Sequence, residues 1–313
     1  MKPRVIFLGT PAFAVPSLDA LAALAAREDI DLAGVVTQPD RPGDRGRVEP
    51  SPVKRRAAEL GLTVLQPVLL NGDAVQPIAG LRADALVWAA YGNLIPRRLI
   101  DGVDGRAVNV HASLLPRWRG AAPVAHAILA GDRETGVTLM QGTASLDRGP
   151  LIAAATTPIA PDETAGELTE RLARLGGALL ERELPAYLAE STQPVAQDES
   201  GATWAPKLMT ADGELHLAEP AEALARRIRA MTPDPGAWTT FNGQRLGVLR
   251  ASVAGGRGAQ HGTLELRDGV PHVAAGAGWL RLDELKPAGK RAMSGAEWAR
   301  GLRDRGAEAR LPS

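Results

Sequence analysis

"VIFLGTPAFAVPSLDALAALAA", residues 5–26, is the stretch that decides the fold. It opens with four apolar residues at 5–8, passes through a Gly-Thr-Pro turn at 9–11, and continues as an Ala- and Leu-rich run at 15–26. The first run predicts a buried strand and the last predicts a helix. A strand that leads directly into a helix is the first half of a βαβ unit, so the stretch predicts an α/β chain with a parallel sheet.

Four later apolar runs extend this pattern through the first half of the chain. They predict strands at 33–37, 85–90, 107–110 and 137–140. Helices are predicted at 52–60, with Ser51 as N-cap, from Pro123 to Gly131, and at 164–188. Residues 1–190 are therefore predicted to form a Rossmann-like domain, with a parallel sheet covered by helices.

The pattern changes after residue 190. Residues 191–206 are polar and lack periodicity, which predicts a linker. Helices are predicted beyond it at 219–231 and 296–303. Between them, short apolar runs separated by Gly-rich turns predict strands at 238–242, 244–252, 262–266, 272–275 and 279–285. Closely spaced strands of this kind predict a small C-terminal β-barrel or sandwich over 207–313.

Composition excludes several classes of protein. The chain has no cysteine, which excludes a disulfide scaffold and a metal site built from thiolates. No apolar run approaches the length of about 20 residues that crosses a membrane, and the N-terminus lacks the pattern of a signal peptide. A cytoplasmic protein is therefore predicted. Its wealth of Ala, Gly and Arg is typical of a bacterial source with a GC-rich genome.

Two polar residues stand at the end of the predicted strand at 107–110. Asn109 and His111 are two positions apart, so on an extended strand their side chains point to the same face, roughly 7 Å apart. Ligands of an open parallel sheet bind outside the carboxyl ends of its strands. Four segments are expected to meet there: the turn at 9–10, the segment 90–92, this pair and the loop after Met140. The pair is then either part of a ligand site or a hydrogen-bonded polar pair at a strand end.

The loop "QGTASLDRGP", residues 141–150, contains one carboxylate, Asp147. A carboxylate beside an imidazole can fix the ring's tautomer, and an Asn amide donates a hydrogen bond at any pH. Asn109, His111 and Asp147 together can polarise a carbonyl and stabilise a tetrahedral oxyanion without a protein nucleophile. The alternative for Asp147 is a solvated turn residue. No cluster of His, Asp and Glu has the spacing of metal ligands, so no metal is expected.

The segment "NVHASLLPRWRGAAP", residues 109–123, resembles the signature of the 10-formyltetrahydrofolate-dependent formyltransferases. In that family an Asn-x-His pair precedes a Ser-Leu-Leu-Pro turn, and a catalytic Asp follows in a Leu-Asp-x-Gly loop at the separation found here between His111 and Asp147. The resemblance implies that Asn109, His111 and Asp147 are catalytic and that 10-formyltetrahydrofolate is the formyl donor. It places the folate site on two segments: Ser113, Leu114, Leu115 and Pro116, and the less distinctive Tyr91, Leu94 and Ile95.

Within the family, the segments at 5–18, 37–62, 204–208 and 286–295 are similar to those of members that formylate methionine on initiator tRNA. This resemblance spans essentially the whole chain. It implies that initiator Met-tRNA is the partner, that 207–313 is a tRNA-binding barrel of the oligonucleotide-binding type, and that the loop with Arg41, Arg45 and Arg47 reaches the acceptor end. Arginine forks suit phosphates and base edges, although a solvated loop of mixed charge has the same composition. A monomer without an obligatory protein partner is expected.

Other acceptors and classes have their own sequence features. A formyltransferase acting on a nucleotide-linked amino sugar can share both domains, but such members normally lack the insertion at 38–46. The loop "LDRGPLI", residues 146–152, is closer to the glycinamide ribonucleotide enzymes, which usually hold the substrate phosphate with a Gly- and Ser-rich first turn that this chain lacks. A Rossmann-type nucleotide-binding protein without catalysis is disfavoured because the first turn lacks the G-x-G-x-x-G pattern.

Overall fold

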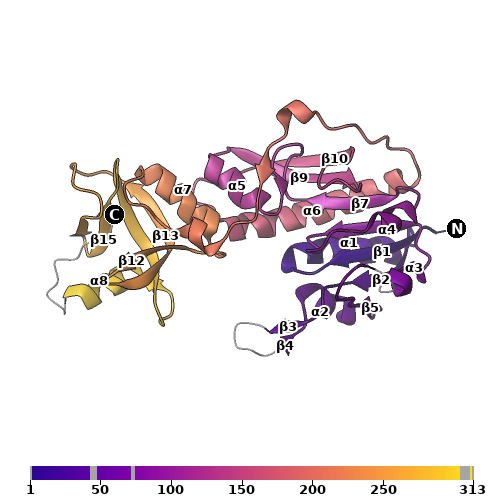
Figure 1. Cartoon of the computed structure of the whole chain (residues 1–313), viewed down its shortest axis with the longest axis horizontal. Coiled ribbons are helices and arrows are strands. Elements are labelled where there is room, and N and C mark those ends of the chain that lie inside the picture. The colour runs from indigo at the N-terminus through magenta and orange to yellow at the C-terminus, as the bar shows by residue number, and fades with distance from the viewer. Residues whose placement is uncertain (1, 43–47, 72–74, 304–310, 312–313) are drawn as a thin grey trace. The chain divides into compact units, whose positions relative to one another are not determined.

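The computed structural model describes residues 2–42, 48–71, 75–303 and 311. The chain divides into two compact units that interleave along the sequence (Figure 1). The first unit comprises Met1–Pro123, Glu134–Pro158 and Thr169–Ala205, and the second comprises Val124–Arg133, Ile159–Leu168 and Pro206–Ser313. Among the described residues, no helix has the length and apolar character that crossing a membrane requires.

The first unit is built on one sheet. Within the described part of the chain, this sheet has seven strands in the order β10-β9-β7-β6-β1-β2-β5. The bounds are β1 Arg4–Gly9, β2 Asp31–Val36, β5 Val64–Leu65, β6 Ala85–Ala89, β7 Ala107–His111, β9 Glu134–Gln141 and β10 Leu151–Pro158. β5, β2, β1, β6 and β7 pair in parallel, which confirms the parallel sheet predicted from residues 5–26.

The predicted strand at 137–140 runs in the opposite direction to its neighbour. β9 pairs antiparallel with β7 and with β10, so its expected parallel orientation is wrong. Gln141, the last residue of β9, lies opposite Val108, near the start of β7. The loop after Met140 therefore leaves the sheet at the edge where the parallel strands begin, not at their carboxyl edge as expected.

Helices connect these strands as the βαβ pattern requires. They are η1 Ala12–Ala14, α1 Val15–Ala26, α2 Pro52–Glu59, α3 Gln76–Ala79 and α4 Arg97–Asp101, and α6, Ala165–Leu188, contributes to both units. Ser51 caps α2 as predicted, because its hydroxyl accepts the Lys54 N–H at 3.2 Å. Ile6, Leu8, Val36 and Leu86 belong to one buried apolar cluster of the sheet, so burial of these strand residues stabilises the unit.

The second unit contains an antiparallel sheet, as expected for the C-terminal part. In the described residues, its strands lie in the order β12-β13-β16-β15-β14, with β17 paired to β16. The bounds are α5 Pro123–Ala130, η4 Thr210–Gly213, α7 Ala221–Met231, β12 Ala237–Phe241, β13 Gln244–Ala254, β14 Leu264–Arg267, β15 Val270–Ala274, β16 Trp279–Pro287, β17 Met293–Ser294 and α8 Gly295–Arg303. Leu224 and Ile228 of α7 pack with Val248 and Leu282 of the sheet in one core. The pairings form an open path, so closure into a barrel stays a prediction.

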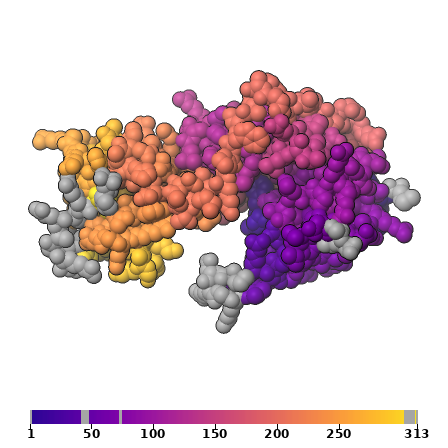
Figure 2. Space-filling view, in the orientation of Figure 1, coloured from indigo at the N-terminus to yellow at the C-terminus, as the bar shows by residue number. Residues whose placement is uncertain are grey.

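Residues 191–205, named the strap from here on, are bound to the first unit instead of forming a free linker. Val195 exchanges two backbone hydrogen bonds with Leu151, at 2.7 and 2.8 Å. After η3, Glu199–Gly201, the strap ends in β11, Trp204–Ala205, which pairs in parallel with β8, Arg119–Gly120. In Figure 2 the salmon atoms of the strap lie on the surface of the first unit. A polar segment without periodicity still carries backbone donors and acceptors, and here β8 and β10 satisfy them.

Candidate active site

Asn109 and His111 lie on the same face at the end of β7, as the sequence predicted. Both are buried, with 7% of each residue exposed. Asn109 is flanked in the sheet by Trp88 of β6 and Met140 of β9. Its side chain forms no hydrogen bond with any residue that the structure describes, and part of it remains accessible. The Asn109 amide is therefore free to donate to a bound molecule.

Asp147 reaches this pair by an indirect route. Gly142 donates its N–H to the Ala107 carbonyl at 2.7 Å, which holds the start of the loop beside the first residue of β7. Five residues later, Asp147 Oδ1 lies 3.8 Å from His111 Nδ1, beside the last residue of the same strand. The loop therefore returns along β7. The structure brings together the three residues expected at the site, although not at the sheet edge from which the loop was expected to start.

The surroundings of His111 define which ring nitrogen carries a hydrogen. Nε2 lies 3.0 Å from the Trp118 carbonyl oxygen, which can only accept, so Nε2 carries a hydrogen. Nδ1 faces the Asp147 carboxylate at a distance too long for a direct hydrogen bond but within the range of an ion pair. A second proton on Nδ1 would face this carboxylate. With a hydrogen on Nδ1, the ring would present an N–H donor on the same face of β7 as the Asn109 amide.

Gly120 holds the carboxylate in place and was not singled out from the sequence. Its N–H donates to Asp147 Oδ2 at 2.8 Å, while Oδ1 faces His111. A Cβ at position 120 would lie 2.6 Å from the Ala205 carbonyl oxygen, and the φ of 120° also favours glycine. Asp147 itself has a φ of 51°, so the loop holds this residue in a left-handed conformation. The "RG" dipeptide within residues 109–123 was the available signal.

The Ser-Leu-Leu-Pro turn follows β7 and is fixed by Thr138. The Thr138 hydroxyl donates to the Ser113 carbonyl at 2.7 Å and accepts the Leu115 N–H at 3.1 Å. The buried Ser113 hydroxyl donates to the Arg117 carbonyl, so it is used inside the turn. Leu115 is also buried, whereas Leu114 and Pro116 are half-buried. Leu114 and Pro116 are therefore the turn side chains that a ligand can contact.

The second predicted folate segment follows β6. Tyr91 is buried, and its carbonyl accepts hydrogen bonds from the Thr10 hydroxyl and the Gln38 amide, both at 3.1 Å. Its own hydroxyl has no hydrogen-bond partner in the described part of the chain, and burial raises the pKa of this phenol. Leu94 is 74% exposed and Ile95 is half-buried. The Tyr91 hydroxyl is enclosed, so Leu94 and Ile95 are the side chains of this segment that a bound molecule can contact directly.

The predicted tRNA loop is described only in part. Arg41 lies in β3, Arg41–Pro42, which pairs with β4, Val48–Glu49, and its guanidinium donates to Gln38 Oε1 at 2.7 Å. Arg45 and Arg47 lie outside the described residues. Lys54 and Gln66 both bind the Asp40 carboxylate nearby, and the hydrogen bond from Lys54 is the main cause of a lowered pKa for Asp40. Arg41 is therefore held beside Gln38, whose amide also contacts Tyr91.

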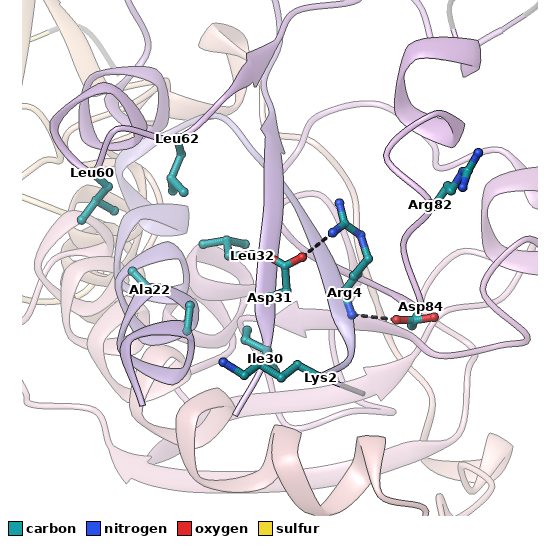
Figure 3. Close-up of a pocket in the computed structure, with 11 residues that line it drawn as sticks. Lys2, Arg4, Ala22, Ile30, Asp31, Leu32, Leu60, Leu62, Arg82 and Asp84 are labelled. Atoms are coloured by element: carbon teal, nitrogen blue, oxygen red, sulfur yellow. Dashed lines mark hydrogen bonds and ion pairs between the residues drawn. The ribbon is translucent and has the colours of Figure 1, made fainter. Parts of the chain in front are cut away.

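A hollow of about 860 Å³ lies away from these residues, at the opposite edge of the sheet (Figure 3). Arg4 and Asp31 in its lining begin β1 and β2, and Asp84 precedes β6. Arg4 Nη1 lies 2.5 Å from Asp31 Oδ2, and the Arg4 N–H donates to Asp84 at 2.7 Å. Arg4 thus pairs with both carboxylates of the lining, and none of the residues expected at the β7 site lines this hollow. Among the described residues, no group of three or more His, Asp and Glu could hold a metal ion.

Comparisons with known proteins show the family of the chain. A family model described as formyl transferase matches residues 3–184, and one described as formyl transferase, C-terminal domain, matches residues 207–303. Methionyl-tRNA formyltransferase from Halorhodospira halophila is 46% identical over 306 residues, with 97% of each chain covered.

Two solved structures have a similar fold. WlaRD, a sugar 3N-formyl transferase determined in the presence of dTDP and 5-N-formyl-THF, matches with a TM-score of 0.68 at 15% identity over 93% of this chain and 100% of its own. HypX from Aquifex aeolicus in complex with tetrahydrofolic acid matches with a TM-score of 0.65 at 17% identity. That match covers 95% of this chain and 47% of HypX. At these identities the likeness concerns the fold alone.

Proposed function

This chain belongs to the formyl transferase family, and we propose that it transfers the formyl group of 10-formyltetrahydrofolate to the free α-amino group of methionine on initiator tRNA. Family membership makes the chain an enzyme that transfers formyl groups. The near end-to-end match with a methionyl-tRNA formyltransferase supports the acceptor. The family and the tetrahydrofolate held by HypX support a folate-derived donor.

One relationship carries the proposal: the approach of Asp147 Oδ1 to 3.8 Å from His111 Nδ1, on the strand that also presents Asn109. Formyl transfer to an amine needs donors for an oxyanion and a group that accepts a proton. Asn109 has an unused amide, His111 has an N–H group, and Asp147 has a carboxylate. All three are buried, where hydrogen bonds to a developing charge are stronger than in water.

In the proposed reaction the neutral α-amine attacks the formyl carbon, and the formyl oxygen becomes an oxyanion. The Asn109 amide and the His111 Nδ1–H donate to this oxygen, because His111 Nε2 is already used by the Trp118 carbonyl. The bond between the formyl carbon and the folate nitrogen then breaks as the carbonyl re-forms. The amine loses one proton and the folate nitrogen gains one, so the reaction is balanced. Asp147 accepts the first proton and supplies the second, directly or through water.

Substrate binding is assigned to residues around this centre. Leu114, Pro116, Leu94 and Ile95 would contact the folate, and the buried Tyr91 would support the wall of its pocket from inside. Ser113 and Leu115 would shape the turn from inside. Arg41, with Arg45 and Arg47, would bind the acceptor end of the tRNA, and residues 207–313 would add contacts to its phosphates. A monomer remains the expectation.

An acceptor assay tests the proposal. The purified chain is supplied with 10-formyltetrahydrofolate and either initiator Met-tRNA or a nucleotide-linked amino sugar, and the formylated products are measured. Formyl-methionyl-tRNA is the expected product. Formylation of the sugar alone would show that the proposed acceptor is wrong, while the proposed catalytic residues would stand. No transfer to either acceptor, with a folded protein, would contradict the proposal.

A further inference from the structure

Arg119 is a buried cation whose partners lie in the strap. It has no exposed surface. Its guanidinium binds both carboxylate oxygens of Glu199, at 2.8 and 2.9 Å. It also donates to Gln197 Oε1 through Nε at 3.1 Å and Nη2 at 2.7 Å. The hydrogen bond from Arg119 is the main cause of a lowered pKa for Glu199. A buried guanidinium is tolerated because these acceptors compensate its charge and its N–H groups.

Arg119 fixes the orientation of the Gln197 amide. A guanidinium has only donors, so the Gln197 oxygen must face it and the amide nitrogen must point the other way. That nitrogen donates to the main-chain carbonyl of Asp147 at 3.0 Å and to that of Gly149 at 2.7 Å. One side chain of the strap therefore holds two carbonyl groups of the loop that carries the catalytic carboxylate.

The same short strand also holds the carboxylate itself. Gly120 follows Arg119 in β8, and its N–H donates to Asp147 Oδ2. β8 is in turn fixed to the strap, because the Arg119 N–H donates to the Thr203 carbonyl at 2.9 Å. Asp147 thus has its main chain held through Gln197 and its side chain held by Gly120. This support matters because the residue has a left-handed backbone, which is unfavourable for a residue with a Cβ.

We propose that Gln197, oriented by Arg119, is a positioning residue that keeps Asp147 Oδ1 directed at His111 Nδ1 during turnover. Gln197 touches neither reacting group and acts through the loop. The inference rests on the proposed function, since it concerns the rate of formyl transfer. It assigns a part in catalysis to a segment that the sequence predicted only as a linker.

Replacement of Gln197 by Glu gives the sharpest variant. A carboxylate at this position still accepts from Arg119 but has no N–H for the Asp147 and Gly149 carbonyls. We expect kcat for formyl transfer to fall roughly 10- to 100-fold, because a small displacement of a catalytic group has effects of this size. The KM values for folate and tRNA should stay within about twofold, because no proposed substrate contact is removed. Gln193→Glu, an exposed change in the same strap, is the matched control and should keep the wild-type kcat.

A double-mutant cycle separates positioning from a general structural effect. In an Asp147→Asn background, measured in single turnover at high enzyme concentration, Gln197→Glu should cause no further loss if it acts through Asp147. An equal loss in that background would overturn the proposal, as would a kcat equal to that of Gln193→Glu. Gln197→Met supplies a neutral second variant, and melting below the assay temperature in both variants would assign Gln197 to folding instead. A wild-type chain without formyl transfer would contradict the proposed function, and this result is distinct from the outcomes that test Gln197.

Discussion

Asp147 Oδ1 lies 3.8 Å from His111 Nδ1, although the loop that carries Asp147 begins beside the opposite end of the strand that carries His111. The position of the carboxylate therefore depends on the contacts that fix this loop. Gly120, Gln197 and the tight packing of Gly149 provide them; a Cβ on Gly149 would lie 1.6 Å from the Gln141 carbonyl oxygen. The strand places two members of the site and the loop supports place the third.

Asn109→Ala should lower kcat on the order of 100- to 1000-fold, the usual effect of removing one oxyanion donor. The melting temperature should change little, because the Asn109 amide forms no hydrogen bond with the described residues. Steady-state assays and thermal unfolding of the same preparation measure both. Asn71→Ala, an exposed change, serves as the control. A rate for Asn109→Ala within tenfold of wild type would remove Asn109 from the oxyanion site.

Gly120→Ala should reduce both activity and stability. The new Cβ would lie 2.6 Å from the Ala205 carbonyl oxygen, so β8 must move and its N–H must leave Asp147 Oδ2. Strained backbone of this kind costs about 1–3 kcal/mol in the free energy of unfolding. Gly61→Ala is a matched control, since Gly61 also has a positive φ but a Cβ added there would meet nothing within 4 Å. Urea unfolding measures the loss of stability, and steady-state assays measure kcat. The loss of activity should be found for Gly120→Ala and not for Gly61→Ala.

Glu167 gives the second unit a pH-dependent contribution to stability. The pKa of Glu167 is lowered to about 2 by hydrogen bonds. The largest contribution comes from the N–H of Thr164, followed by the Thr164 hydroxyl and Arg250. A lowered pKa means that the carboxylate stabilises the fold above about pH 4.5, its usual value, and that this contribution is lost as the pH falls toward 2. Because 48% of the side chain is exposed, solvent screening limits the effect to about 1 kcal/mol.

Glu167→Gln should therefore unfold about 1 kcal/mol more easily than wild type at pH 7, with a smaller difference at pH 3. Urea titrations at both pH values measure this. Glu170→Gln, an exposed change three positions further along α6, should show no such pH dependence. A difference between wild type and Glu167→Gln that grows on acidification would contradict the assignment.

Arg41→Ala should raise the KM for Met-tRNA while leaving the KM for the folate donor unchanged. Loss of one phosphate contact also reduces the steepness with which tRNA binding weakens as salt rises, by about one unit in the log–log slope. KM values measured across a salt series test this. Arg82→Ala, at the hollow on the opposite edge of the sheet, should leave the slope at its wild-type value. Equal log–log salt slopes for Arg41→Ala and Arg82→Ala would show that Arg41 does not bind the tRNA.

Much of the fold could be predicted because apolar runs mark buried strands. In the C-terminal part, every predicted strand and helix boundary lies within two residues of the observed one. Strand direction could not be predicted in this way, because the run at 137–140 has the same composition in either orientation. β10 was missed because its "LIAAATTP" sequence alternates weakly between half-buried and exposed residues at the edge of the sheet.

The site was predictable to a different degree at each residue. Period-two geometry places Asn109 and His111 on one face, and the structure confirms it. The loop sequence alone left Asp147 as either a partner of His111 or a solvated turn residue, and only the family resemblance favoured the first of these. Gln197 could not be found from sequence at all. Its role depends on a guanidinium far away in the chain, and polar residues of a linker give no periodic signal.

The complete enclosure of Arg119 has a consequence for how this chain can diverge. Lysine offers one compact ammonium and cannot match the planar fork that spans Glu199 and Gln197. A homologue without the arginine would leave the Glu199 carboxylate and the Gln197 amide oxygen without their hydrogen-bond donor. These three positions are thus expected to drift in concert or to stay as they are, while the neighbouring surface varies freely.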